Sequence, residues 1–279
     1  MDGSPTYRED ELDAEVALAL LEWQLEMGVD VPVLDAPLDR FELPARLDPP
    51  APAAAPAPMA APVAAAAAMP AAADDLSARI AEAEALAAAA GSLEALAAAQ
   101  EAFDGIELKK GARRFCCADG RPGARVLILG DAPGDDEDSQ GRPFVGRAGQ
   151  MLDKMFAAIG LARDSVDAER ALYITNTLCW RPPGNRDPSA DEIAVSLPFL
   201  RRQIELAGPD LIVLMGNAAC QAGIGQQGIM RLRGQWVQAF GRPALPMMPP
   251  SYLLANPPAK REAWGDLLSL AERLEALSV

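Results

Sequence analysis

Histidine is absent from all 279 residues of this sequence. Its absence excludes every site that depends on an imidazole, including histidine-based catalytic triads, histidine zinc ligands and histidine general bases. Only four cysteines are present, too few for a disulfide scaffold. The sequence also lacks a long apolar run that could span a membrane, and its first residues are acidic where a signal peptide is basic. We therefore expect a cytoplasmic protein with no membrane partner.

The acidic charge is confined to the N-terminal third of the chain. The formal net charge is −15, which taken alone argues against a polyanionic partner. Residues 1–102, however, carry 19 acidic and 4 basic side chains, whereas residues 103–279 carry 21 of each, and 17 of those 21 bases are arginine. Nucleic acid therefore stays open as a partner for the second part of the chain.

Composition divides the chain into four parts. Residues 1–48 are acidic and include an amphipathic helix predicted at 7–28, whose apolar side chains recur every three or four residues. This helix packs on its own domain, stays disordered or binds a partner protein. Residues 49–74 are mostly Ala and Pro and predict a linker. Residues 75–102 predict a helical lead-in broken at Gly91-Ser92, and residues 103–279 form the main domain.

The main domain alternates short apolar runs with helical patterns. Residues 125–129 (RVLIL), 171–175 (ALYIT) and 211–215 (LIVLM) are typical of buried parallel strands. Helices are predicted near 147–160, 189–207, 217–223 and 260–277. The pattern predicts an α/β fold, a three-layer α/β/α sandwich with a central, mainly parallel sheet, preceded by a helical or disordered N-terminal extension.

The loops after the predicted strands carry the chemically informative residues, because ligands bind at the carboxyl ends of parallel strands. The first strand precedes GDAPGDDED (130–138) and GRPFVGRAG (141–149), and the second precedes Asn176 and WRPPGNR (180–186). The first loop matches no phosphate-binding motif, and its five acids would repel phosphate. Instead it offers carboxylate, while Phe144 offers a flat apolar face and Asn176 a bidentate amide.

The motifs GDAPGDDED, GRPFVGRAGQML, YITN, RPPGNR and PSYLL follow one another in this order. With them, the run from about residue 108 to 270 resembles the bacterial uracil-DNA glycosylase superfamily, and within it the thermophile-type iron–sulfur branch, family 4. The resemblance implies a uracil-DNA glycosylase-like fold and a DNA repair enzyme that flips uracil out of single- or double-stranded DNA and excises it.

By motif position, the resemblance also implies the roles of individual residues. Asp131 would orient the attacking water or stabilise the cationic sugar, Phe144 would stack on uracil, and Asn176 would read its Watson–Crick edge. The residues implied around the base are Gly130, Ala132, Pro133, Gly134, Phe144 and Asn176. Those implied at the DNA are Arg181, Asn185, Arg186, Ser251, Leu253 and Leu254, with one of the two leucines as a wedge.

The sequence departs from family 4 at the residues that would hold its cofactor. The four cysteine ligands of the family's 4Fe-4S cluster fall on Phe103, Ile106, Trp180 and Ser196. The cysteines that are present, Cys116, Cys117, Cys179 and Cys220, lie elsewhere and are expected to be buried apolar thiols. We therefore predict no metal and no cofactor, with an apolar plug of Phe103, Ile106 and Trp180 instead.

A second departure concerns catalysis. The family's H-P-S motif has Pro249 in its histidine position, and proline offers no donor to the leaving uracil. Ser251 or a backbone N–H would then supply that hydrogen bond. Two functions follow: an active glycosylase of reduced or shifted specificity, nucleoid-associated in a bacterium, or a non-catalytic relative that binds DNA or a repair protein.

Overall fold

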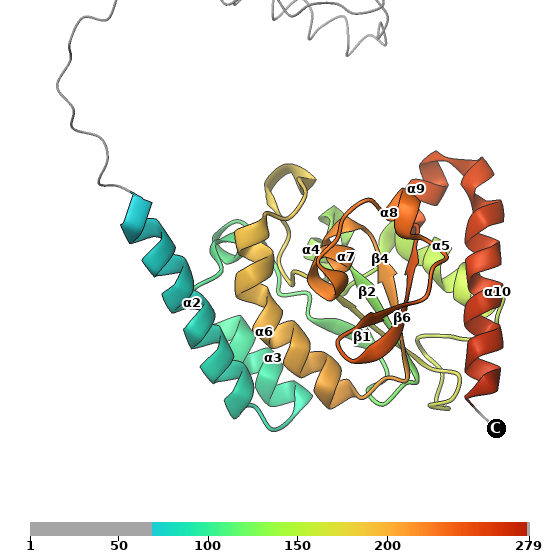
Figure 1. Cartoon of the computed structure of the whole chain (residues 1–279), viewed down its shortest axis with the longest axis horizontal. Coiled ribbons are helices and arrows are strands. Elements are labelled where there is room, and N and C mark those ends of the chain that lie inside the picture. Colours follow the sequence, from blue (N-terminus) through green and yellow to red (C-terminus); the bar gives the residue numbers. More distant parts are fainter. Residues whose placement is uncertain (1–68, 278–279) are drawn as a thin grey trace, which may run out of the picture. The chain divides into compact units, whose positions relative to one another are not determined.

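The computed structural model describes residues 69–277 of the chain (Figure 1). The helix predicted at 7–28 and most of the linker predicted at 49–74 lie outside these residues. None of the described helices is long and apolar enough to cross a membrane.

Within residues 69–277, six strands form one sheet in the order β1-β3-β2-β4-β6-β5. The four central strands pair in parallel, and the two edge strands pair antiparallel to their neighbours. Every residue of β2, β3 and β4 is buried, as expected for parallel strands covered on both faces. The three strands predicted from the sequence are confirmed. The bounds are β1 (Ala118–Gly120), β2 (Val126–Gly130), β3 (Leu172–Asn176), β4 (Leu211–Met215), β5 (Val237–Ala239) and β6 (Arg242–Met247).

Helices cover both faces of the sheet, so the predicted three-layer sandwich is confirmed. Alternate residues of β2 point to opposite faces. Ile128 belongs to a core shared with α5 (Gly146–Ala157), α9 (Pro250–Ala255) and α10 (Lys260–Ala276). Leu129 belongs to a second core shared with α6 (Ala190–Ala207) and α7 (Asn217–Ile224).

Two further helices, α2 (Met69–Ala89) and α3 (Leu93–Ala102), lie beside α6 (Figure 1). They are separated at Gly91-Ser92 as predicted, and the Ser92 hydroxyl caps α3 by accepting a hydrogen bond from the Ala95 N–H at 3.2 Å. Helix α2 begins at Met69, so the predicted linker boundary at 74 is wrong. Alanine has the highest helix propensity, and Pro70 falls in the first turn, where its missing N–H costs nothing.

The sequence missed the short elements. These are β1, β5 and β6, the α-helices α4 (Asp135–Gln140), α8 (Ile229–Leu232) and α9, and the 3-10 helices η1 (Glu107–Lys110), η2 (Pro183–Asn185) and η3 (Pro257–Ala259). Most are too short to show a period, and two prolines interrupt the apolar pattern of β6.

Candidate active site

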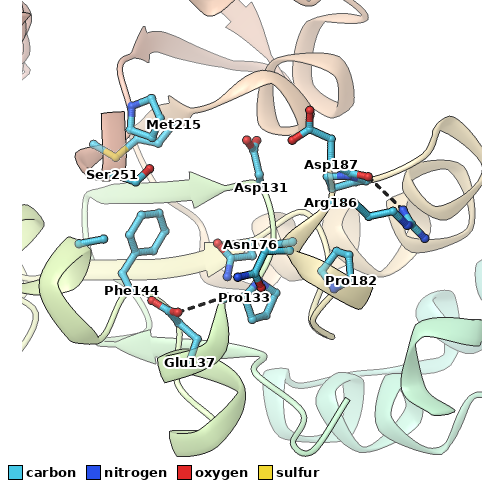
Figure 2. Close-up of a pocket in the computed structure, with 16 residues that line it drawn as sticks. Asp131, Pro133, Glu137, Phe144, Asn176, Pro182, Arg186, Asp187, Met215 and Ser251 are labelled. Carbon is cyan, nitrogen blue, oxygen red and sulfur yellow. Dashed lines mark hydrogen bonds between the residues drawn. The ribbon is translucent and has the colours of Figure 1, made fainter. Parts of the chain in front are cut away.

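A cavity of about 490 Å³ opens at the carboxyl ends of β2, β3 and β4 (Figure 2). Its volume falls in the usual range for small-ligand sites, about 300–1,000 Å³. The sequence-predicted residues that line it are Asp131, Ala132, Pro133, Gly134, Phe144, Asn176, Asn185, Arg186 and Ser251. The structure therefore brings most of the predicted site together from five separate motifs.

Asp131 follows β2 directly and is anchored to the first turn of α7. Its Oδ1 accepts a hydrogen bond from the Ala219 N–H at 2.9 Å. Gly216 precedes α7 with a φ of 124°, and a side chain there would overlap the Asp131 carboxylate. Glycine is therefore needed at this position both for its backbone angle and for the space it leaves.

The electrostatics of Asp131 are dominated by burial. Burial raises the pKa of Asp131 to about 6, the N–H groups of α7 pull it down, and the carboxylate of Asp187 across the cavity raises it. A carboxyl group poised this close to neutrality in a cavity is typical of catalytic acids and bases.

Phe144 has an unusual backbone conformation two residues before the start of α5. Its φ is 50°, which is rare for an aromatic residue. Its carbonyl accepts a hydrogen bond from Arg163 Nη2 at 2.8 Å, and it comes so close to Gly149 that a side chain there would clash with it. Strain of this kind persists only where the surroundings enforce it, and it is common at functional sites.

Asn176 ends β3 and is only 3% exposed. It pairs with Gly130 in the parallel ladder, and a Cβ on Gly130 would overlap both the Asn176 Oδ1 and the Phe144 ring. Within the described part of the chain, the Asn176 amide has no hydrogen-bond partner, so its donor and acceptor remain available to a ligand. Gly130 does not line the cavity itself but makes room for the two side chains that do.

Glu137 was not predicted as a site residue, yet it joins the two loops of the cavity. Its Oε2 accepts a hydrogen bond from the Gly134 N–H at 3.1 Å, which Figure 2 marks. Its Oε1 accepts one from the Val145 N–H, also at 3.1 Å. The sequence signal was available: a Glu in the third position of a helix commonly bonds back to the residue before it. Asp138 next to it is buried and accepts from the N–H groups of Arg113 and Arg114. The acidic run is thus partly structural.

The loop of residues 181–188 forms another wall, and its arginines are paired within the protein. Arg181 lies 2.6 Å from Asp135, which also accepts a hydrogen bond from Asn185. Arg186 contacts both carboxylate oxygens of Glu192. Arg181 does not line the cavity. The loop also presents Asp187, which the sequence analysis missed because nothing distinguishes it from an ordinary surface acid.

The C-terminal wall consists of Met215, Pro249 and Ser251. Pro249 therefore lies in the cavity, where the family resemblance would place a histidine. Leu253 is 0% exposed and lies in the core, so its predicted contact with DNA is wrong. The helical period of α9 turns Leu253 inward and leaves Leu254 in a neighbouring groove.

The four positions of the family's cluster ligands do not fit an iron–sulfur cluster. Phe103, Ile106 and Trp180 are each 3% exposed and lie in one apolar cluster, which confirms the predicted plug. Ser196 is buried, and its hydroxyl has no hydrogen-bond partner among the described residues. Thiolate ligands are what such a cluster requires, and these side chains supply none.

The four cysteines do not make up for the lost ligands. Cys116 donates its N–H to the carbonyl of Cys179 at 2.8 Å, and Cys117 accepts a weak hydrogen bond from Gln203. Cys220 lies apart from them in α7, where burial raises the pKa of its thiol to about 12. Across the described residues, no group of three or more His, Cys, Asp or Glu side chains is arranged to hold a metal ion.

Sequence comparisons assign the chain to a family. Residues 117–268, more than half of the chain, match the uracil DNA glycosylase superfamily, and the chain belongs to it. It is 47% identical over 100 residues to the type-4 uracil-DNA glycosylase of Sulfurisphaera tokodaii, covering 36% of this chain and 43% of that protein. It is 43% identical over 115 residues to the Archaeoglobus fulgidus enzyme of the same name, covering 41% and 55%. A third such protein, from Saccharolobus solfataricus, is 33% identical over 168 residues, covering 57% and 75%. The matches thus span about half the length of the first two relatives.

Proposed function

We propose that this protein is a DNA repair glycosylase that flips uracil out of DNA and hydrolyses its glycosidic bond without an iron–sulfur cluster and without a catalytic histidine. The observation that carries the proposal is the meeting of Asp131, Phe144 and Asn176 in one cavity. A protein that only bound DNA would need none of these three side chains in that place. The type-4 relatives named above support uracil as the base.

Base recognition follows from the two residues around Gly130. The Phe144 ring stacks on a base that has left the duplex, because a flipped base loses its own stacking partners. The free amide of Asn176 donates to uracil O4 and accepts from N3–H. Cytosine carries an amino group and a bare N3 at these positions, so it would leave buried polar groups unpaired.

Catalysis depends on protein groups that lie next to the atoms of the substrate that become charged in the transition state. As the bond between C1′ and uracil N1 breaks, the sugar becomes cationic, and the anchored carboxylate of Asp131 stabilises it or orients the attacking water. The uracil leaves as an anion. Ser251 lines the cavity and its hydroxyl is not engaged elsewhere in the described structure, so it donates to that anion in place of the missing histidine.

DNA contact is expected around the cavity mouth. Asn185, Arg186 and Ser251 line the cavity, and Leu254 in the adjacent groove is the candidate wedge that fills the gap left by the flipped base. Because Arg181 and Arg186 already have carboxylate partners, we expect them to contribute less to phosphate binding than unpaired arginines would. The partner at residues 7–28 remains a sequence prediction.

A single-turnover assay tests the proposal. Protein in excess is mixed with single- or double-stranded oligonucleotides that carry one uracil, and abasic sites are counted after alkaline cleavage. We expect uracil release by the wild-type protein and, for Asn176→Ala, a loss of at least about 100-fold. An oligonucleotide with cytosine at the same place is the substrate control. Binding without any release would favour the alternative, a non-catalytic DNA-binding relative, for which Pro249 in the histidine position is the supporting observation.

A further inference from the structure

Three carboxylates line the cavity, and backbone N–H groups engage two of them. Asp131 accepts from the first turn of α7, and Glu137 accepts from Gly134 and Val145. The third, Asp187, forms no side-chain hydrogen bond or ion pair with any described residue, and only its backbone carbonyl is engaged. It is therefore the one carboxylate of this cavity, within the described structure, whose lone pairs are all available.

The position of Asp187 is nevertheless fixed by its neighbours. Arg186 donates a hydrogen bond to the Asp187 carbonyl at 3.0 Å, and both of its terminal nitrogens donate to the Glu192 carboxylate. Pro188 restricts the backbone on the other side of Asp187. Earlier in the loop, Arg181 forms an ion pair with Asp135, and Asn185 donates a hydrogen bond to the same carboxylate. The arginines that the sequence assigned to DNA thus hold an acidic residue at the rim of the cavity.

Asp187 also lies apart from the side chains that would hold the base. In the view of Figure 2 it is on the far side of Asp131 from Phe144 and Ser251. A uracil held between Phe144 and Asn176 places its sugar towards Asp131. Water attacks C1′ on the face opposite the departing base, and Asp187 is the cavity carboxylate on the side of Asp131 away from Phe144.

We propose that Asp187 is a further catalytic residue of this site, which accepts the proton of the attacking water. This inference rests on the proposed function. The water oxygen bonds to C1′ as the bond from C1′ to uracil N1 breaks with its electron pair, and one water proton passes to the Asp187 carboxylate. The products are an abasic site with a hydroxyl at C1′ and a uracil anion, which takes a proton from solvent.

The two acids then have separate tasks. Asp131 is held by α7 and stabilises the sugar cation, whereas Asp187, with no donor committed to it, is free to take a proton. The other groups that face Asp131 do not compete for this task. The Cys220 thiol beside it stays neutral, since its pKa is raised, and Glu137 is occupied by two N–H groups.

The experiment compares the full-length wild-type protein with Asp187→Asn, Asp187→Glu and a control, Asp191→Asn. The control removes the same charge from an exposed residue of the first turn of α6, outside the cavity. Single-turnover uracil release from a single-stranded oligonucleotide is measured between about pH 5 and pH 9. Melting temperatures are recorded for all four proteins and should agree, since the Asp187 side chain has no contacts to lose.

We expect Asp187→Asn to lower the rate by at least about tenfold, Asp187→Glu to recover part of that loss, and the control to match the wild type. The acid limb of the pH profile should also move to lower pH in Asp187→Asn, because removing this charge lowers the pKa of Asp131. A residue that acted only through its charge on Asp131 would move the limb but leave the rate on the plateau unchanged. An active wild type with an unchanged Asp187→Asn rate overturns the role of Asp187 alone, whereas a wild type that releases no uracil overturns the proposed function with it.

Discussion

Gly130 and Asn176 face each other across the β2–β3 ladder, and the Asn176 Oδ1 occupies the space that a Cβ on Gly130 would fill. The Phe144 ring closes in on the same point, 2.6 Å from that Cβ position. One glycine therefore allows the stacking ring and the reading amide to approach each other. The relationship makes Gly130 a sensitive probe of the base pocket.

Gly130→Ala is expected to lower uracil release by on the order of 100-fold, since a displacement of about 1 Å at a reacting site has this effect. Overpacking should also cost about 1–3 kcal/mol of unfolding free energy, measured by urea denaturation. Gly265→Ala in α10, where a new Cβ meets nothing within 4 Å, is the control and should keep full activity. Equal rates for the two variants would contradict the proposed pocket.

Asp131→Asn is expected to abolish activity and to stabilise the fold. Burial raises the pKa of Asp131 from 3.8 to about 6, so between these values the folded state binds the proton more tightly than the unfolded state. Stability therefore falls as pH rises through this window and stays lower above it. The variant should exceed the wild type by about 1–3 kcal/mol at neutral pH and lose that advantage near pH 4. Urea unfolding at both pH values checks this. A difference between variant and wild type that is the same at both pH values would argue against a buried, destabilised carboxylate.

Pro249→His should raise the rate of uracil release. Pro249 lines the cavity with a φ of −66°, which other residues adopt without strain. An imidazole there can donate to the leaving uracil anion, and one such donor is worth a gain of at least about tenfold. Pro249→Ala removes the ring without adding a donor and should show no gain. If both variants behave alike, the histidine position does not face the leaving group.

The protein is expected to contain no stoichiometric iron after anaerobic purification. Phe103, Ile106 and Trp180 fill three of the four ligand positions with apolar side chains and exclude thiolate ligation there. Metal analysis and the visible absorption spectrum measure this directly. Iron at the content of a full cluster would mean that the cysteines form a ligand set that the described residues do not show.

Ser196→Ala should raise the unfolding free energy by about 1 kcal/mol. The buried Ser196 hydroxyl has no partner among the described residues, so the fold bears its desolvation cost without a hydrogen bond in return. Ser189→Ala is the opposing control, because the Ser189 hydroxyl caps α6 and its loss should cost about 1 kcal/mol. Denaturation of both variants should therefore give shifts of opposite sign.

The sequence predicted those features that repeat or that match a motif. The three central strands and the helices α5, α6, α7 and α10 have runs long enough to show a period, and the residues of the first loop gather in one cavity as the motif order implied. Leu253 was misassigned because neighbouring residues of a short helix point to opposite sides, which no motif records. Asp187 and Glu137 depend on contacts between loops that are distant in sequence, and only the fold reveals them.

The Gly134 and Val145 N–H groups both donate to the Glu137 carboxylate, which ties the loop that carries Asp131 to the loop that carries Phe144. The entropy lost in ordering these loops is then spent when the chain folds and not when DNA arrives. More of the binding free energy remains for unstacking a base and pulling it out of the helix. If the protein is the glycosylase proposed above, how readily the DNA opens then limits the search for damage, since the pocket is already shaped.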